Sequence, residues 1–180
     1  MFGAEVSMAS AATPTGCCPP FDPTPWRDAT IEWNNHRFVK DHVRSVFHVP
    51  LDMGRKVTRN KRLIDAAGAA PAHPLMLCDE SSPWGSDIYL EVDRNVPGAQ
   101  MATMSGTFLT RVYDGPFSEA GRWADDMTAW LKQRGESAEQ LYFAYTTCPS
   151  CARAYGHNWV VVFAKVAERP DEEERSAVPT

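Results

Sequence analysis

The chain has 180 residues, of which 43% are hydrophobic, and it carries a formal net charge of −5. That length suits one domain, and six Trp, eight Phe and five Tyr supply material for a substantial core. A net negative charge argues against nucleic-acid binding, which requires a basic surface, and no segment reaches the roughly 18 apolar residues of a membrane span. We therefore expect neither nucleic acid nor a membrane as a partner.

The two ends of the chain differ in composition from its middle. Residues 1–16 are small and polar and lack the basic start and apolar centre of a signal peptide, so they predict a disordered tail on a cytoplasmic protein. Residues 17–30 form an arm rich in proline and cysteine, which disfavours regular helix and strand. Residues 31–166 hold the patterned, folded part, and the acidic residues 167–180 predict a second disordered tail.

The folded part contains an internal repeat. The segment SVFHVPLDMGRK (45–56) corresponds to RVYDGPFSEAGR (111–122), and each combines a short β-like run, a proline-containing turn and the start of a helix. The helices end at Gly68 and Gly135, because glycine is the preferred residue just after a helix C-terminus. Two strand candidates follow each helix, at 75–78 and 86–92 and again at 140–147 and 158–166. The half-repeats span about 42–97 and 104–166.

This repeat predicts an α+β fold. The second helix places four apolar side chains on one face: Trp123, Met127, Trp130 and Leu131. Helices that cover one face of an antiparallel sheet leave its other face free. Two pseudo-symmetric strand–helix–strand–strand repeats side by side therefore predict a curved antiparallel sheet with an open ligand cleft.

One stretch of the second half carries a family resemblance. The segment GTFLTRVYDGPFSEAGRWADDMTAWLKQRG (106–135), with its VY-x-GP-F turn before the helix, resembles the GyrI-like small-molecule-binding fold, and the likeness extends over about 42–166. Together with the CCPP and TTCPSC motifs, the chain looks like a bacterial subgroup of that fold that is often labelled hydrolase. The resemblance implies a cleft for hydrophobic, often aromatic or cationic, small molecules.

The same resemblance implies several functions. Some relatives are sensing halves of transcription regulators, some bind a partner protein, and others hydrolyse cyclopropane-containing DNA alkylators. No DNA-binding region accompanies the repeats here, which disfavours the regulator. We therefore expect a hydrolase that detoxifies a hydrophobic electrophile by adding water, as a self-resistance protein would. The alternatives are a non-catalytic protein that sequesters or senses its ligand, and a redox protein that depends on zinc or thiols.

Strand alternation assigns catalytic candidates to the cleft. In SDIYLEV (86–92), Asp87, Tyr89 and Glu91 face away from the helices. Many GyrI-like proteins carry a cleft glutamate in the final strand; that position is Val161 here, and Asp87 is its pseudo-symmetric counterpart. Burial in an apolar pocket would raise the pKa of such a carboxyl group and suit it to general-base catalysis, with Tyr89 as a donor. Alternatively, Asp87 and Glu91 are solvated surface residues, and Lys165 pairs with Glu91.

Aromatic side chains supply the candidate walls of the cleft. Alternation along the last strand places Trp159 and Phe163 on the open face. Four further aromatic residues complete the predicted ligand-binding set: Phe47, Trp84, Tyr113 and Tyr145. A hydrophobic, aromatic small molecule would stack on them. The alternative is that these residues are ordinary core.

The cysteines offer a third kind of site. Cys148 and Cys151 have the C-x-x-C spacing of a zinc knuckle, and Cys17 and Cys18 could complete a structural zinc site. One histidine, His157, His36 or His42, could instead replace one of the adjacent pair. The same CPSC motif also fits a dithiol redox site or a pair of inert thiols. We find no dinucleotide or phosphate-binding fingerprint and expect no organic cofactor.

Overall fold

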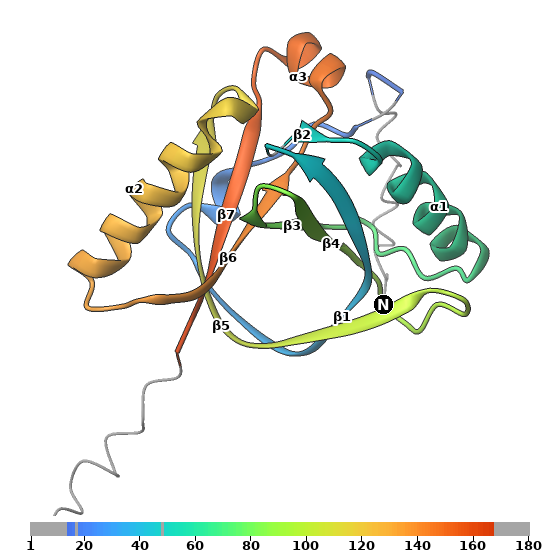
Figure 1. Ribbon diagram of the computed structural model, residues 1–180, viewed down its shortest axis with the longest axis horizontal. Helices are drawn as coiled ribbons and strands as arrows, with labels where there is room; N and C mark the ends of the chain where they lie inside the picture. Colours follow the sequence, from blue (N-terminus) through green and yellow to red (C-terminus); the bar gives the residue numbers. More distant parts are fainter. Residues whose placement is uncertain (1–13, 17, 48, 168–180) are drawn as a thin grey trace, which may run out of the picture.

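The computed structural model describes residues 14–16, 18–47 and 49–167. Most of the predicted N-terminal tail, Cys17 and the acidic tail from residue 168 lie outside these described residues. The elements, drawn in Figure 1, are the single turns η1 (Thr24–Trp26) and η2 (Phe117–Glu119), the helices α1 (Met53–Ala66), α2 (Ala120–Gln133) and α3 (Pro149–Tyr155), and the strands β1 (Thr30–Val46), β2 (Val49–Pro50), β3 (Met76–Ser82), β4 (Gly85–Glu91), β5 (Gln100–Asp114), β6 (Ala138–Tyr145) and β7 (Trp159–Val166). None of the helices in the described part is long and apolar enough to cross a membrane.

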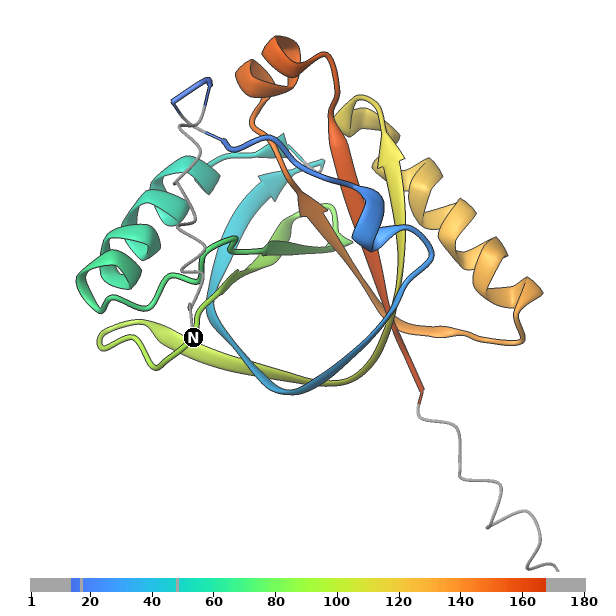
Figure 2. The ribbon, with the colours of Figure 1, turned by 180° about the vertical axis from the view of Figure 1, so that it is seen from behind.

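The strands form one antiparallel sheet in the order β2-β1-β4-β3-β6-β7-β5. A further pairing between β1 and β5 closes six of these strands into a barrel. The helices α1 and α2 lie on opposite sides of the outer surface, and each follows the first strand of its half-repeat (Figures 1 and 2). The predicted α+β class, with two strand–helix–strand–strand repeats and a curved antiparallel sheet, is confirmed.

Barrel closure depends on the length of β1 and on an irregularity within it. The first part of β1 pairs with β5, from Thr30 opposite Leu109, and its last part pairs with β4, from Phe38 opposite Glu91. Between Trp33 and His36 the register shifts, with Asn35 at φ 51°. Because one extra residue moves the following side chains to the other face, odd-numbered side chains point inward before the bulge and even-numbered ones after it.

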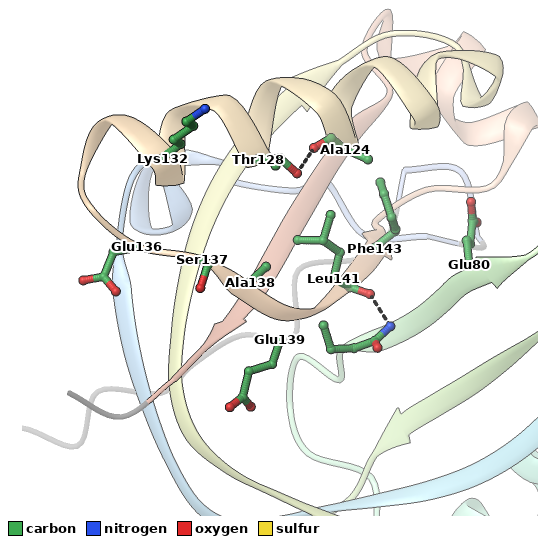
Figure 3. A pocket seen from close by; sticks show the side chains of 11 residues that line it. Glu80, Ala124, Thr128, Lys132, Glu136, Ser137, Ala138, Glu139, Leu141 and Phe143 are labelled. Carbon is green, nitrogen blue, oxygen red and sulfur yellow. Dashed lines mark hydrogen bonds between the residues drawn. The ribbon is translucent and has the colours of Figure 1, made fainter. Parts of the chain in front are cut away.

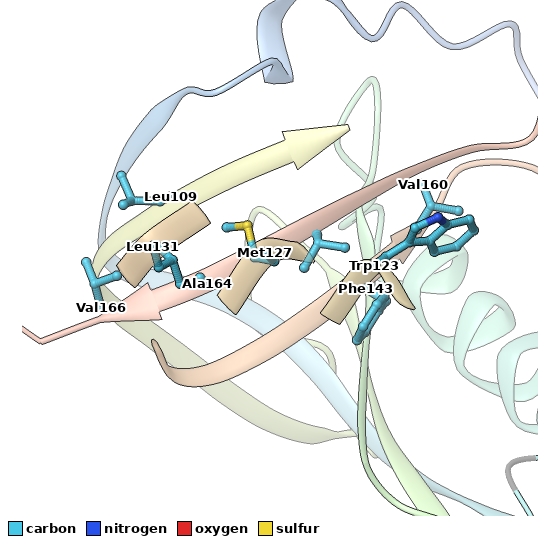
Figure 4. Packing of buried hydrophobic residues seen from close by; sticks show 9 residues of the cluster. Leu109, Trp123, Met127, Leu131, Phe143, Val160, Ala164 and Val166 are labelled. Atoms are coloured by element: carbon cyan, nitrogen blue, oxygen red, sulfur yellow. The ribbon is translucent and has the colours of Figure 1, made fainter. Parts of the chain in front are cut away.

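Helix α2 covers the outer face of the second half-repeat, as its periodicity predicts. Trp123, Met127 and Leu131 are buried on this face of the helix. They pack against four outward side chains of β7: Val160, Val162, Ala164 and Val166. Figure 4 shows this cluster from close by. Trp130 is only partly buried at the edge of this cluster, where the guanidinium group of Arg134 lies 4.7 Å from its ring centroid.

Helix α1 is attached to the barrel by a buried ionic cluster that its weak apolar pattern does not predict. The carboxylate of Asp41, on the outer face of β1, accepts bonds from Lys56 Nζ at 3.0 Å, Arg59 at 2.6 Å and Asn60 Nδ2 at 2.8 Å. Asp41 is 7% exposed and Asn60 is 1% exposed. Burial raises the pKa of Asp41, but the bonds from Lys56 and Asn60 and the charge of Arg59 outweigh it and hold the pKa below its ordinary value.

The inner face of the barrel is predominantly aromatic. Its buried cluster contains Phe38, Leu77, Tyr89, Met104, Phe108, Ala144, Val161 and Phe163. The N-terminal arm adds Phe21 and Trp26, which pack against this cluster, and the Trp26 and Phe163 rings meet edge to face at 5.5 Å. The centre of the inner face is therefore filled by side chains, and half-exposed residues surround it.

Candidate functional site

A cluster of ionisable side chains, Lys40, His42 and Asp87, lies at one end of the inner face, where β1 and β4 pair. Lys40 stands opposite Tyr89 and His42 stands opposite Asp87 in the register of these strands. The Asp87 carboxylate accepts a bond from Lys40 Nζ at 2.7 Å through one oxygen and contacts His42 Nδ1 at 2.7 Å through the other. Alternation correctly places Asp87 and Tyr89 on the inner face, whereas the presence of Lys40 and His42 beside them depends on the register between β1 and β4.

The pKa of Asp87 is lowered, and the prediction of a raised pKa is wrong. Burial raises the pKa of this carboxyl group, as predicted. Hydrogen bonds from Lys40 and His42, together with their charges, outweigh burial and leave the pKa below its ordinary value. Asp87 is thus a carboxylate at neutral pH, and its two oxygens are already bonded to neighbours. This arrangement suits a residue that orients a histidine better than it suits a base that attacks water directly.

Because Asp87 is ionised, it determines which ring nitrogen of His42 donates a hydrogen bond to it. A carboxylate can only accept, so His42 Nδ1 must donate to Asp87, and in the neutral ring the proton is absent from Nε2. The ring lies over Gly85, where an added Cβ would come within 2.6 Å of Nε2 and 2.9 Å of the Val43 carbonyl oxygen. The His42 side chain is 61% exposed, so water has access to it. This histidine–carboxylate pair is the arrangement of a general base.

Two tyrosines border this charged group on the aromatic side. Burial raises the pKa of Tyr89, and Lys40, whose Nζ lies 5.4 Å from the ring centroid, offsets only part of that effect. Tyr142 on β6 meets Tyr89 edge to face at 5.7 Å, and burial raises the pKa of Tyr142 to about 12. Both phenols therefore keep their protons at neutral pH and can act as hydrogen-bond donors.

Glu91, the third predicted catalytic residue, is bonded within the sheet. One carboxylate oxygen contacts His36 Nε2 at 2.7 Å, and the other accepts a bond from the backbone N–H of Leu75 at 2.8 Å. These contacts join β1, β4 and the chain before β3. The alternative pairing of Glu91 with Lys165 is wrong, because Lys165 Nζ lies 3.1 Å from Glu139.

The predicted ligand-binding aromatics fall on three different surfaces. Phe163 is fully buried in the inner-face cluster, and Trp159 shares its side of β7, with the guanidinium of Arg27 at 5.6 Å from the ring centroid. Phe47 and Trp84 are exposed, at 73% and 61%, and meet each other where the β1–β2 and β3–β4 turns lie.

The predicted inner-face placement of Tyr113 and Tyr145 is wrong. Both stand opposite Val160, which faces helix α2, so their rings lie on the outer face. Tyr113 stacks on Trp123, and its hydroxyl donates to Asp126 at 2.8 Å. The Tyr145 hydroxyl donates to Glu80, and burial raises the pKa of Tyr145.

Three of the predicted metal-ligating cysteines come together. The thiols of Cys18, Cys148 and Cys151 lie within 4.8 Å of one another, although the first is 130 residues from the second. The fourth predicted ligand, Cys17, lies outside the described residues. The alternative histidines are held elsewhere: His157 contacts Asp114 at 2.7 Å, and His36 and His42 belong to β1. Cys78 is buried in the core as predicted, where burial raises its pKa to about 12.

A groove on the outer face was not predicted. It has a volume of about 550 Å³ and lies between α2 and the segment 136–143. Figure 3 shows Ala124, Thr128 and Lys132 on the helix side of the groove and Leu141 and Phe143 on the strand side. Three glutamates also line the groove, Glu80, Glu136 and Glu139, but it contains none of the histidine–carboxylate pairs.

Solved structures share this architecture at low sequence identity. The C-terminal domain of EcmrR matches with a TM-score of 0.61 and 10% identity, over 78% of this chain and 97% of that one. A hydrolase from Listeria innocua matches with a TM-score of 0.55 and 11% identity, over 79% and 92%. SAV2435, solved with bound tetraphenylphosphonium, matches with a TM-score of 0.50 and 10% identity, over 77% and 93%. These likenesses establish the GyrI-like fold.

A search of curated proteins gives no match. A family model, by contrast, matches residues 8–166, which include the arm, both half-repeats and all the candidate residues described above. The match therefore covers the barrel and the cysteine-rich arm together. The chain belongs to the bacterial hydrolase family.

Proposed function

We propose that this cytoplasmic protein binds a hydrophobic small molecule at the inner face of the barrel and adds water to it. The observation that carries the proposal is the link that Lys40 makes between the His42–Asp87 pair and the tyrosine-lined inner face: its Nζ lies 2.7 Å from Asp87 and 5.4 Å from the Tyr89 ring centroid. A family described as bacterial hydrolases and a structural neighbour solved with tetraphenylphosphonium support a small-molecule ligand. Two other histidine–carboxylate pairs lie beside aromatic rings, His36–Glu91 against Trp33 and His157–Asp114 against Trp159. The His42 side chain is the most exposed of the three histidines, at 61% against 32% and 54%, which favours it as the base that water can reach.

In the proposed reaction, His42 Nε2 removes a proton from water while Asp87 holds the ring and stabilises its positive charge. The water oxygen bonds to the electrophilic carbon of the substrate, and the electrons of the broken bond move to the leaving atom. Lys40 and Tyr89 carry protons at neutral pH and lie beside Asp87, so either can stabilise or protonate that atom.

The side chains that line the inner face indicate the class of substrate. Aromatic rings and few polar groups favour a flat, hydrophobic compound. An electrophile with a strained ring, such as a cyclopropane-containing DNA alkylator, needs only the addition of water across the ring to become inert. In this proposal the protein detoxifies such a compound and gives self-resistance to the cell that holds it.

A second candidate function is binding without turnover. The structural neighbour solved with bound tetraphenylphosphonium favours it. Because Phe38, Phe108 and Phe163 are fully buried, a ligand must move side chains or bind at the edge of the inner face in either case. A protein of this kind would sequester or sense the compound and would consume no more than one equivalent. A structural zinc ion at the cysteine cluster is compatible with either function, and we propose it as the cofactor.

Replacing Tyr142 with leucine should weaken ligand binding about fivefold or more, because a stacking contact contributes about 1 kcal/mol. Titration with tetraphenylphosphonium, followed by tryptophan fluorescence, measures this effect. The control is Thr128→Leu, which narrows the outer groove without touching the inner face. If Thr128→Leu weakens binding and Tyr142→Leu does not, the ligand occupies the outer groove and the proposed site is incorrect.

A further inference from the structure

The cysteine cluster brings together two parts of the chain that are far apart in the sequence, the N-terminal arm and helix α3. Cys18 belongs to the N-terminal arm, whereas Cys148 and Cys151 lie at the start of α3, between β6 and β7. Cys151 is 1% exposed, and the other two thiols are partly buried. Three thiols within 4.8 Å of one another form a ligand set that soft metal ions such as zinc prefer.

Neighbouring polar groups hold the cluster in position. The backbone N–H of Cys148 donates to Cys18 Sγ at 3.4 Å and holds the thiol of the arm at the start of α3. The Tyr155 hydroxyl donates to the Cys18 carbonyl oxygen at 2.6 Å, and Thr15 Oγ1 lies 3.0 Å from that hydroxyl and 3.2 Å from Cys151 Sγ. Such surrounding bonds orient metal-ligating side chains in known sites.

The arm itself depends on attachment at its ends. Four prolines, Pro19, Pro20, Pro23 and Pro25, remove backbone donors, and none of the arm's described residues before Thr30 belongs to a strand. At its far end the Thr110 hydroxyl donates to the Trp26 carbonyl oxygen at 2.8 Å, and the Thr110 N–H donates to Ala29 at 2.9 Å. At its near end, the described contacts centre on the cysteine cluster.

We propose that Cys18, Cys148 and Cys151 bind one zinc ion as thiolates and that this ion fastens the arm across the inner face. Each thiol releases its proton as it binds the ion. The ion then keeps Phe21 and Trp26 against the aromatic cluster, where they cover the approach to Phe163. This inference concerns metal binding and arm attachment, so it can hold or fail independently of the hydrolytic function.

Metal binding is tested by titrating the metal-free full chain with Co²⁺, whose tetrahedral thiolate complexes absorb visible light, and by elemental analysis of the protein as purified. About one metal per chain is expected. Cys18→Ser, Cys148→Ser and Cys151→Ser should each abolish the absorption, and Cys78→Ala, which removes a thiol in the core, should keep it. No metal, or equal binding by Cys18→Ser, overturns the site.

Arm attachment is tested on the wild-type chain, so that a variant that fails to fold cannot obscure the result. Trypsin cleavage after Arg27 reports release of the arm, because Arg27 follows Trp26 and contacts the Trp159 ring. A chelator should accelerate this cleavage several-fold, and added Zn²⁺ should restore protection. Cleavage that is unaffected by the chelator in a protein that binds zinc overturns the fastening role.

Discussion

Replacing His42 with glutamine should lower turnover of a cyclopropane-containing electrophile about 100- to 10,000-fold, the usual contribution of a positioned general base. The side chain is 61% exposed and belongs to no apolar cluster, so the thermal unfolding midpoint should remain unchanged. Steady-state kinetics and a thermal scan on the same preparations measure the two effects. His73→Gln, at an exposed position between α1 and β3, is the matched control and should retain full activity.

A second variant tests the position of His42 rather than its chemistry. Gly85→Ala introduces a Cβ that cannot coexist with the present place of the imidazole ring, so it should also lower turnover. It should cost some stability as well, because the Val43 carbonyl oxygen is equally close. Full activity in both His42→Gln and Gly85→Ala would remove His42 from the reaction and place the base that activates water elsewhere in the protein.

Replacing Asp41 with alanine should lower the free energy of unfolding by about 2–4 kcal/mol, because breaking a buried ionic cluster leaves its partners without compensation. Lys56 and Asn60 are the partners that lose most, since Asn60 is buried and Lys56 is only 23% exposed on its side chain. Denaturant unfolding at neutral pH measures the loss. Asp93→Ala removes an exposed pair with Arg94 and should cost less than about 0.5 kcal/mol.

The difference in the free energy of unfolding between wild type and Asp41→Ala should depend on pH. The pKa of Asp41 is lowered in the folded state, so its contribution is fully present above the ordinary aspartate pKa of about 3.9. As pH falls below that value and through the lowered pKa, the carboxylate takes up a proton and the contribution disappears. The difference between wild type and Asp41→Ala should therefore shrink in acid. A difference that stays constant down to acid unfolding would show that the charge of Asp41 is not what stabilises α1.

Local patterns in the sequence predict much of this fold. Glycine caps place the ends of α1 and α2 near Gly68 and Gly135, and alternation places Val160 and Phe163 on opposite faces of β7. Barrel closure is different, because it depends on the pairing of β1 with β5 over most of their length. The sequence of β1 is rich in charged residues and its alternation is interrupted near Asn35, so local patterning alone does not reveal it.

The sequence predicts only part of the candidate site, because the rest depends on the register between strands. Alternation in β4 identifies Asp87 and Tyr89, but Lys40 and His42 meet them only through the register between β1 and β4. Their charges reverse the pKa shift that burial alone predicts for Asp87. The outward placement of Tyr113 and Tyr145 follows from their pairing with Val160, which likewise requires knowledge of the strand register.

Turnover in excess substrate tests the central claim most directly. The protein is mixed with a large molar excess of a cyclopropane-containing DNA alkylator, and the ring-opened water adduct is counted per protein chain, with His42→Gln as the blank. The proposed function predicts that the adduct accumulates well beyond one equivalent in the wild type and not in the variant. Accumulation that stops at one equivalent, or that proceeds equally in both proteins, would contradict it.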